Sequence, residues 1–195
     1  MENEVIINFK NKLNSYYSIT EESFNLLLDD AKIFDLKKND ILVDEGQISH
    51  NFYFLYLGYI IAYFNNSDGR TYNKNIFVAN DLIASTVSSI QKKPSEFTIQ
   101  AVSYCTLLKI PYNKFKKLVF KRDDLKMFYI HYLEKNWIID KEKREVSIIL
   151  ESAYSRYKQL IDANPDLEKN VPLLHIASHL GITPTQLSRI RKQIK

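Results

Sequence analysis

Apolar positions divide the chain into three blocks with different periods. In residues 4–33, and again from Tyr112 to the end, apolar residues recur three and four positions apart, which predicts amphipathic helices. Residues 36–111 instead carry short β-branched and aromatic runs separated by turn residues, which predicts an antiparallel roll or sandwich. The chain is therefore expected to be α+β, with an antiparallel β-roll between flanking helices. The expected strands are 41–43, 52–57, 59–64, 76–78, 96–101 and 107–110.

The helical stretch after residue 123 is apolar on more than one side, because Leu133, Trp137 and Ile138 lie off the main stripe. Such a helix must be covered on more than one side. It is either a core helix covered by its own chain, or a helix that faces the roll on one side and a second copy on the other. We favour the second interpretation, a long dimerisation helix. Its expected interface residues are Leu125, Phe128, Tyr129, Tyr132 and Ile139.

The strongest local pattern lies in residues 172–194. A short amphipathic helix is followed by Gly181, where a helix C-terminus favours a left-handed residue. Thr183, Pro184 and Gln186 then fit the N-cap, the first position and the capping-box position of a second helix. Two short helices joined by a tight glycine turn predict a helix-turn-helix.

The second of these helices has one apolar and one polar face. Leu187, Ile190 and Ile194 are expected to point inward, and hydroxyl and cationic side chains form the other stripe. Such a stripe suits the major groove of DNA, because arginine can bind guanine with two hydrogen bonds or hold a phosphate. The alternative is a helical hairpin with a solvated polar face. The expected DNA-binding residues are Thr183, Thr185, Gln186, Ser188, Arg189, Arg191 and Lys192, with Arg191 and Lys192 on phosphates.

Charge and composition narrow the class of protein. The net charge is +4 over 195 residues, and residues 171–195 hold four cations and no acid, so the rest of the chain is neutral. A basic end favours a polyanionic partner, although a solvated tail gives the same count. The single cysteine, Cys105, excludes disulfide frameworks and cysteine-rich metal sites within this chain. A single cysteine also favours a reducing compartment, so we expect a cytoplasmic protein. No apolar run reaches the ~18 residues of a membrane helix, so we expect no membrane contact.

Catalytic and metal-binding patterns are weak. The four glycines are not spaced for a phosphate-binding loop, and no nucleophile–base pair is evident. His175 and His179 stand four positions apart, a spacing that can bind a metal, but no acidic residue accompanies them. We expect solvated or phosphate-adjacent histidines, no metal site and no catalytic residue, so an enzyme is the least supported class.

The stretch 176–192 resembles the recognition motif of the Crp/Fnr superfamily of bacterial transcription regulators, above all at Leu180-Gly181 and Ser188-Arg189. The resemblance extends over nearly the whole chain. It implies a cyclic-nucleotide-binding-like β-roll of the jelly-roll kind, and a homodimer on a palindromic operator in double-stranded DNA, with RNA polymerase as a further partner. The implied domains are a sensor roll at 1–122, a dimerisation helix at 123–150 and a helix-turn-helix domain at 151–195.

The sequence departs from the superfamily in the implied effector pocket. Members that bind cyclic AMP carry Gly-Glu-Leu and then an arginine followed by serine or threonine, and that arginine pairs with the cyclic phosphate. Here Ser95 stands in the place of the arginine, and Glu96 follows it. A like charge at ~4 Å costs about 4 kcal/mol at an effective dielectric of ~20, so we expect cyclic AMP and cyclic GMP not to bind. Because Asp81 can keep a sugar contact, a less anionic effector stays open. The implied pocket residues are Asn80, Asp81, Leu82, Ile83, Ser95 and Glu96.

Together these patterns predict a homodimeric, sequence-specific DNA-binding regulator with the recognition helix 184–194 in the major groove. The alternative is a ligand-sensing or protein-interaction module whose helix-turn-helix binds DNA only non-specifically.

Overall fold

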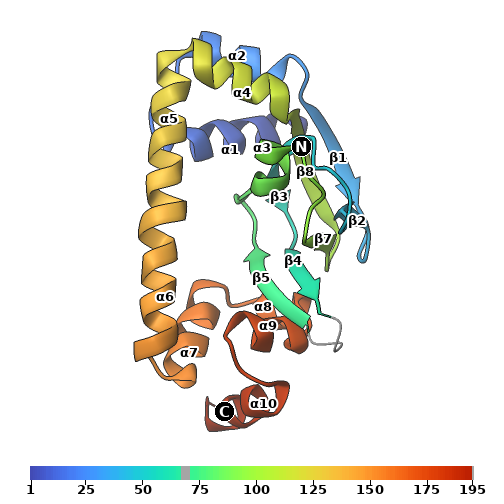
Figure 1. The fold of residues 1–195 in the computed structure, drawn as a ribbon, viewed down its shortest axis with the longest axis vertical. Coiled ribbons are helices and arrows are strands. Elements are labelled where there is room, and N and C mark those ends of the chain that lie inside the picture. Colours follow the sequence, from blue (N-terminus) through green and yellow to red (C-terminus); the bar gives the residue numbers. More distant parts are fainter. Residues whose placement is uncertain (67–70, 195) are drawn as a thin grey trace.

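Two four-stranded antiparallel sheets form the centre of the molecule (Figure 1). The computed structural model describes residues 1–66 and 71–194. The strand order is β1-β8-β3-β6 in one sheet and β2-β7-β4-β5 in the other, and we call the two sheets together the roll. The antiparallel roll predicted from the short apolar runs is therefore confirmed. The strands are β1 Lys32–Leu36, β2 Ile41–Val43, β3 Asn51–Leu57, β4 Ile60–Asn65, β5 Thr71–Phe77, β6 Leu82–Ile83, β7 Thr98–Ala101 and β8 Cys105–Pro111.

Alternating side chains of both sheets fill the space between them. Leu55, Ile60, Ile83 and Leu107 are fully buried there, beside the thiol of Cys105. Burial raises the pKa of the Cys105 thiol, which agrees with an inert core residue. The short helix α3, Thr86–Gln91, lies within the roll, between β6 and β7 along the chain.

Three helices cover one end of the roll (Figure 1): α1 Glu2–Asn14, α2 Glu21–Leu28 and α4 Tyr112–Lys121. As predicted, Thr20 is an N-cap, because its Oγ1 accepts a hydrogen bond from the backbone N–H of Ser23 at 3.2 Å. Aromatic and aliphatic residues of these helices form one apolar core with strands β3 and β8 and the start of the next helix. Its buried members include Phe9, Leu13, Leu27, Phe54, Phe115 and Phe128.

A long helix stands beside the roll and joins its helical end to the C-terminal helices (Figure 1). It consists of α5 Asp123–Leu133, a π-helical stretch η1 Glu134–Ile139, and α6 Asp140–Leu150. The predicted dimer face needs a correction at its start, because Leu125 and Phe128 are buried in the core of their own chain. Tyr129 and Tyr132 pack against that same core, whereas Ile139 is 46% exposed.

Four helices follow the long helix and lie at the other end of the roll: α7 Ala153–Ala163, α8 Leu167–Asn170, α9 Leu173–His179 and α10 Pro184–Ile194 (Figure 1). They share one apolar cluster with the roll, which we call the docking cluster. The buried members of the docking cluster are Ile61 and Val102 from the roll, and Tyr157, Leu167, Val171, Ile176, Ala177, Leu180 and Leu187 from the helices.

No helix among the described residues is long and apolar enough to cross a membrane.

The turn between β3 and β4 requires glycine. Gly58 has a φ of +102°, and an added Cβ would collide with the carbonyl oxygen of Tyr104 and lie 2.6 Å from Sγ of Cys105. Gly46 also has a positive φ, +84°, but nothing lies within 4 Å of its added Cβ. A side chain at either position would strain the backbone, but only a side chain at position 58 would also collide with neighbouring atoms.

We predict that Gly58→Ala lowers the free energy of unfolding by about 3 kcal/mol, because strain and overpacking add. Gly46→Ala is the matched control and is expected to cost about 1 kcal/mol, from the left-handed backbone alone. Urea unfolding followed by circular dichroism measures both. Equal losses in the two variants would contradict the collision.

Candidate nucleic-acid interface

Local hydrogen bonds fix the angle between α9 and α10. The backbone N–H of Ile182 donates to the carbonyl of Ala177 at 3.0 Å, and Gly181 between them has a φ of +69°. Thr183 Oγ1 accepts from the N–H of Gln186 at 3.2 Å, and Gln186 Oε1 accepts from the N–H of Thr183 at 2.9 Å. The predicted glycine turn and capping box are therefore confirmed, and they leave α10 little freedom relative to α9.

One face of α10 is buried and the other is open to solvent. Leu187 is fully buried in the docking cluster and Ile190 packs against it, as predicted. The prediction that Ile194 points inward falls on a side chain outside the described part of the structure. We call the exposed face the polar stripe. It consists of Thr185, Ser188, Arg189 and Lys192, all exposed, and Thr183 and Gln186 are exposed beside it.

The two cations of the polar stripe are free of acidic partners. Within residues 1–66 and 71–194, neither Arg189 nor Lys192 takes part in an ion pair or a hydrogen bond through its side chain. α10 lies at the end of the molecule opposite α1, α2 and α4 (Figure 1). The stripe can therefore meet an extended polyanion, and its hydroxyl and guanidinium groups are types that contact base edges and phosphates.

Arg191 does not belong to this stripe, which corrects its predicted role on a DNA phosphate. Its Nε lies 2.6 Å from Oε1 of Glu168, an ion pair whose angle does not fit a hydrogen bond. The hydroxyl of Tyr157 donates to the same oxygen at 2.5 Å. Burial and this hydrogen bond raise the pKa of Tyr157 to about 12. Arg191 thus holds α10 against α7 and α8.

The edge strand β5 is closed by a side chain of α9. Ser178 Oγ accepts a hydrogen bond from the N–H of Asn73 and donates to the carbonyl of Thr71, both at 2.8 Å. The hydroxyl thus takes the place of a neighbouring strand for one residue pair. An edge strand otherwise presents unpaired backbone groups to solvent, so this contact anchors α9 on the roll.

The two histidines of α9 also pack inward, which corrects the expectation that they are solvated or near phosphate. His175 packs against the ring of Tyr63, with centroids 5.5 Å apart. Arg144 of the long helix donates to the carbonyl of Lys74 at 2.7 Å, and its other terminal nitrogen lies 3.3 Å from Nδ1 of His179. Burial and the adjacent guanidinium lower the pKa of His179 to about 3. A guanidinium at this distance makes Nδ1 a poor cation ligand.

Asp81, in the segment implied as an effector pocket, turns its carboxylate onto its own loop. Its Oδ2 accepts from the N–H of Val78 at 2.9 Å, and burial raises its pKa. Asn80, before it, has a φ of +72° and donates its N–H to Leu55. Leu82 and Ile83 are buried core residues rather than lining. Asn80 and Asp81 thus shape the turn that precedes strand β6, and Leu82 and Ile83 form that strand.

Ser95 and Glu96, the other implied pocket residues, differ in how far solvent reaches them. Ser95 is buried, and its hydroxyl donates to the carbonyl of Phe97 at 2.8 Å and lies 2.9 Å from the hydroxyl of Ser85. Its bonding capacity is therefore largely used within the roll. Glu96 is exposed. Burial lowers the pKa of Lys74, and the negative charge of Glu96 partly offsets that shift.

Comparison with known proteins identifies the roll and the overall fold. Residues 33–122 match the family model of the cyclic nucleotide-binding domain. No curated protein matches the chain. The structure is similar to FixK2 from Bradyrhizobium japonicum, with 15% identity, a TM-score of 0.67, and 84% of each chain covered.

Two further solved structures share this fold. The c-di-GMP responsive global regulator CLP from Xanthomonas campestris has 14% identity and a TM-score of 0.65, with 90% of this chain and 91% of that chain covered. The catabolite activator protein of Thermus thermophilus has 13% identity and a TM-score of 0.55, with 94% and 86% covered. At these identities the likenesses show that the fold is shared over most of the chain.

Burial of His179 makes stability depend on pH. Its pKa falls from the ordinary value of 6.5 to about 3, so below pH 6.5 the unfolded chain takes up a proton that the folded chain does not. The contribution of the neutral His179 to the free energy of unfolding is complete above pH 6.5. It is lost as the pH falls toward 3, with a slope of about 1.4 kcal/mol per pH unit. His179→Gln is expected to remove this slope.

Urea midpoints measured from neutral pH down to about pH 4 test this dependence. The control is His50→Gln, which removes an exposed histidine and is expected to keep the wild-type slope. A slope in His179→Gln equal to that of the wild type would show that His179 does not stay neutral in the folded chain.

Proposed function

We propose that this protein is a homodimeric, sequence-specific DNA-binding transcription regulator, and that α10 enters the major groove. The observation that carries the proposal is the polar stripe, which is unpaired and exposed on a helix whose opposite face is buried. In this proposal α9 and α10 form a helix-turn-helix. The similar structures include a protein described as a global regulator and one described as a catabolite activator, which supports a regulator.

The dimensions of α10 agree with this role. Its 11 residues span about 16 Å at 1.5 Å per residue, and the major groove is about 12 Å wide. Ser188 and Arg189 lie near the middle of the helix, where side chains can reach base edges. Lys192 lies one turn further on, in a position to hold a phosphate.

The proposed dimer uses the second half of the long helix. Three apolar residues, Ile139, Val146 and Leu150, line one groove of about 840 Å³ and are 46%, 47% and 77% exposed. Gln159 of α7 also lines this groove, and on the side of the long helix that faces away from the roll Figure 1 shows no other element. Exposed apolar patches of this kind mark protein interfaces. The proposed interface is therefore centred on α6, further along the helix than the sequence pattern placed it.

The three proposed units follow the sequence boundaries: the roll with its helices at 1–122, the dimerisation helix at 123–150 and the DNA-binding unit at 151–195. We further propose that the roll does not accept a cyclic nucleotide phosphate. Ser95 supplies no charge and its hydroxyl is already bonded, and the next side chain is the exposed Glu96. The roll then serves another ligand or forms a platform that contacts RNA polymerase.

Selection of binding sites from a random duplex pool tests the function. The wild type is expected to enrich a palindrome, and Arg189→Ala to lose or relax one position of each half-site, because a bidentate arginine contributes about 1–3 kcal/mol to discrimination. Lys192→Ala is expected to weaken all sites equally and to reduce the salt slope by about one.

The control for this selection is Lys38→Ala, which removes an exposed charge from the roll and is expected to change nothing. Adding cyclic AMP is likewise expected to leave the enriched sequence and its affinity unchanged. Salt-sensitive binding without any enrichment would contradict the proposal and favour a module that binds DNA non-specifically.

The dimer is tested by light scattering after size exclusion. The wild type is expected at twice the chain mass of 23.0 kDa, and Leu150→Glu at the monomer mass, because a charge would be buried in the interface. Phe120→Glu is the matched control, since Phe120 is a 69% exposed apolar residue on α4. A wild type at 23.0 kDa, or a Leu150→Glu dimer, would contradict this interface.

A further inference from the structure

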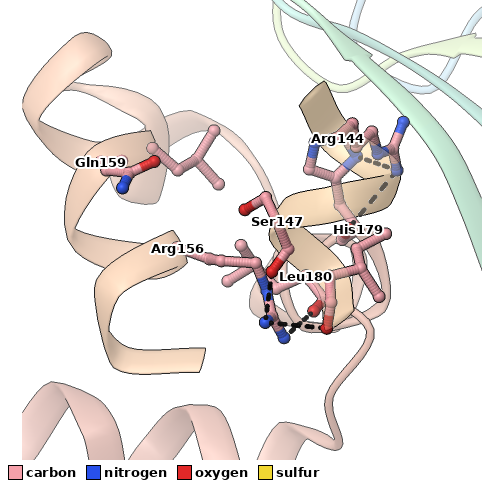
Figure 2. Close-up of a pocket in the computed structure, with 8 residues that line it drawn as sticks. Arg144, Ser147, Arg156, Gln159, His179 and Leu180 are labelled. Carbon is pink, nitrogen blue, oxygen red and sulfur yellow. Dashed lines mark hydrogen bonds between the residues drawn. The ribbon is translucent and has the colours of Figure 1, made fainter. Parts of the chain in front are cut away.

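A pocket lies where the long helix, α7 and α9 meet, outside both the polar stripe and the roll. Its volume is about 280 Å³. Figure 2 shows Arg144 and Ser147 from α6, Arg156 and Gln159 from α7, and His179 from α9 around it. The remaining lining residues are Ile148, Leu160 and Leu180, so the walls contain two guanidinium groups, polar amide and hydroxyl groups, and no carboxylate.

Arg144 is a half-buried cation without an acidic partner. It donates to the carbonyls of Lys74 and His179, at 2.7 and 3.4 Å, and its second terminal nitrogen also donates to Nδ1 of the neutral His179 at 3.3 Å. Burial lowers the pKa of Arg144, and no carboxylate among the described residues forms an ion pair with it. A guanidinium has five N–H donors, so part of its donor capacity is unused.

Arg156 is bonded in the same way. Its terminal nitrogens donate to the carbonyl of Glu151 at 2.5 Å and of Leu180 at 3.0 Å, with longer bonds to Ser147 and Ile148. These bonds cap the end of α6 and explain part of why Arg156 points into this recess. They do not use Nε, which is buried and has no hydrogen-bond partner. They also leave a second guanidinium without an ion pair among the described residues.

Arg144 and Arg156 are half-buried cations that share one recess and have no ion pair among the described residues, which favours an anionic ligand, because partly desolvated charges are normally paired. We propose that this pocket binds a small ligand with an oxyanion head, a phosphate or a carboxylate, and a short apolar body. The head would meet Arg144 and Arg156, with Ser147 Oγ, which bonds to no described residue, as a further donor. The body would lie against Leu160 and Leu180.

Ligand binding here would stabilise the docked position of α9. The pocket needs walls from α6, α7 and α9 together, so it exists only while α9 lies on β5. A ligand that binds one arrangement shifts the population toward it. Because α10 follows α9 through a capped turn, such a ligand would also set the orientation of the polar stripe. This last step rests on the proposed function, whereas binding itself does not.

Calorimetric titration of the full chain with inorganic phosphate, phenyl phosphate and benzoate tests the pocket. Phenyl phosphate or benzoate is expected to bind more tightly than inorganic phosphate, and the stronger of the two identifies the head group. Ser147→Asp places a carboxylate beside the guanidinium groups. It is expected to weaken binding by about tenfold or more, the loss of one charge-assisted contact, and to raise the melting temperature without ligand.

The control is Lys158→Gln, which removes an exposed charge from α7, one of the helices that line the pocket, and is expected to keep wild-type binding. Absence of binding by all three probes, or equal binding by Ser147→Asp and wild type, would overturn the proposal. Neither result depends on DNA. Because Ser147 also lines the groove of the proposed dimer, the mass of Ser147→Asp is measured by light scattering, which separates a lost ligand contact from a lost dimer.

Discussion

The position of α10 depends on how the roll closes its edge strand β5. Ser178 satisfies one backbone donor and one acceptor of that strand, and Ile176 and Ala177 on the same helix are buried in the docking cluster with Ile61 of the roll. Without α9 these polar groups and this apolar surface would face water. Because a glycine turn and a capping box join α9 to α10, the outward direction of the polar stripe follows from this one contact.

Guanidinium groups connect this contact to the long helix. Arg144 joins the long helix to β5 and α9 at once, and Arg156 joins the end of α6 to the end of α9 through Leu180. These hydrogen bonds and the capped turn between α9 and α10 therefore connect the exposed apolar face of α6 to the polar stripe of α10. A dimer formed through α6 would fix the distance between its two recognition helices, which reading two half-sites requires.

Local chemistry was predictable from the sequence, and long-range partners were not. Gly181, Thr183 and Gln186 act on neighbours within a few positions, so their roles follow from spacing alone. The burial of Leu125 and Phe128 was predictable, but periodicity does not say which element covers a stripe, and here it is the chain's own core. Arg191 and His179 were misplaced because Glu168 and Arg144, their partners, are distant in sequence. The two-residue strand β6 and the six-residue, serine-containing α3 are too short for periodicity to reveal.

The proposed dimer places its two α10 helices one turn of DNA apart, and a spin-label distance measures this separation directly. Ser188→Cys places a label on the exposed face of α10, and Cys105, the native thiol, is fully buried and unreactive to labelling. Pulsed dipolar spectroscopy in the presence of duplex DNA is expected to give one distance distribution centred near ~34 Å. A sample without dipolar coupling, or a distribution centred well away from that spacing, would contradict the account.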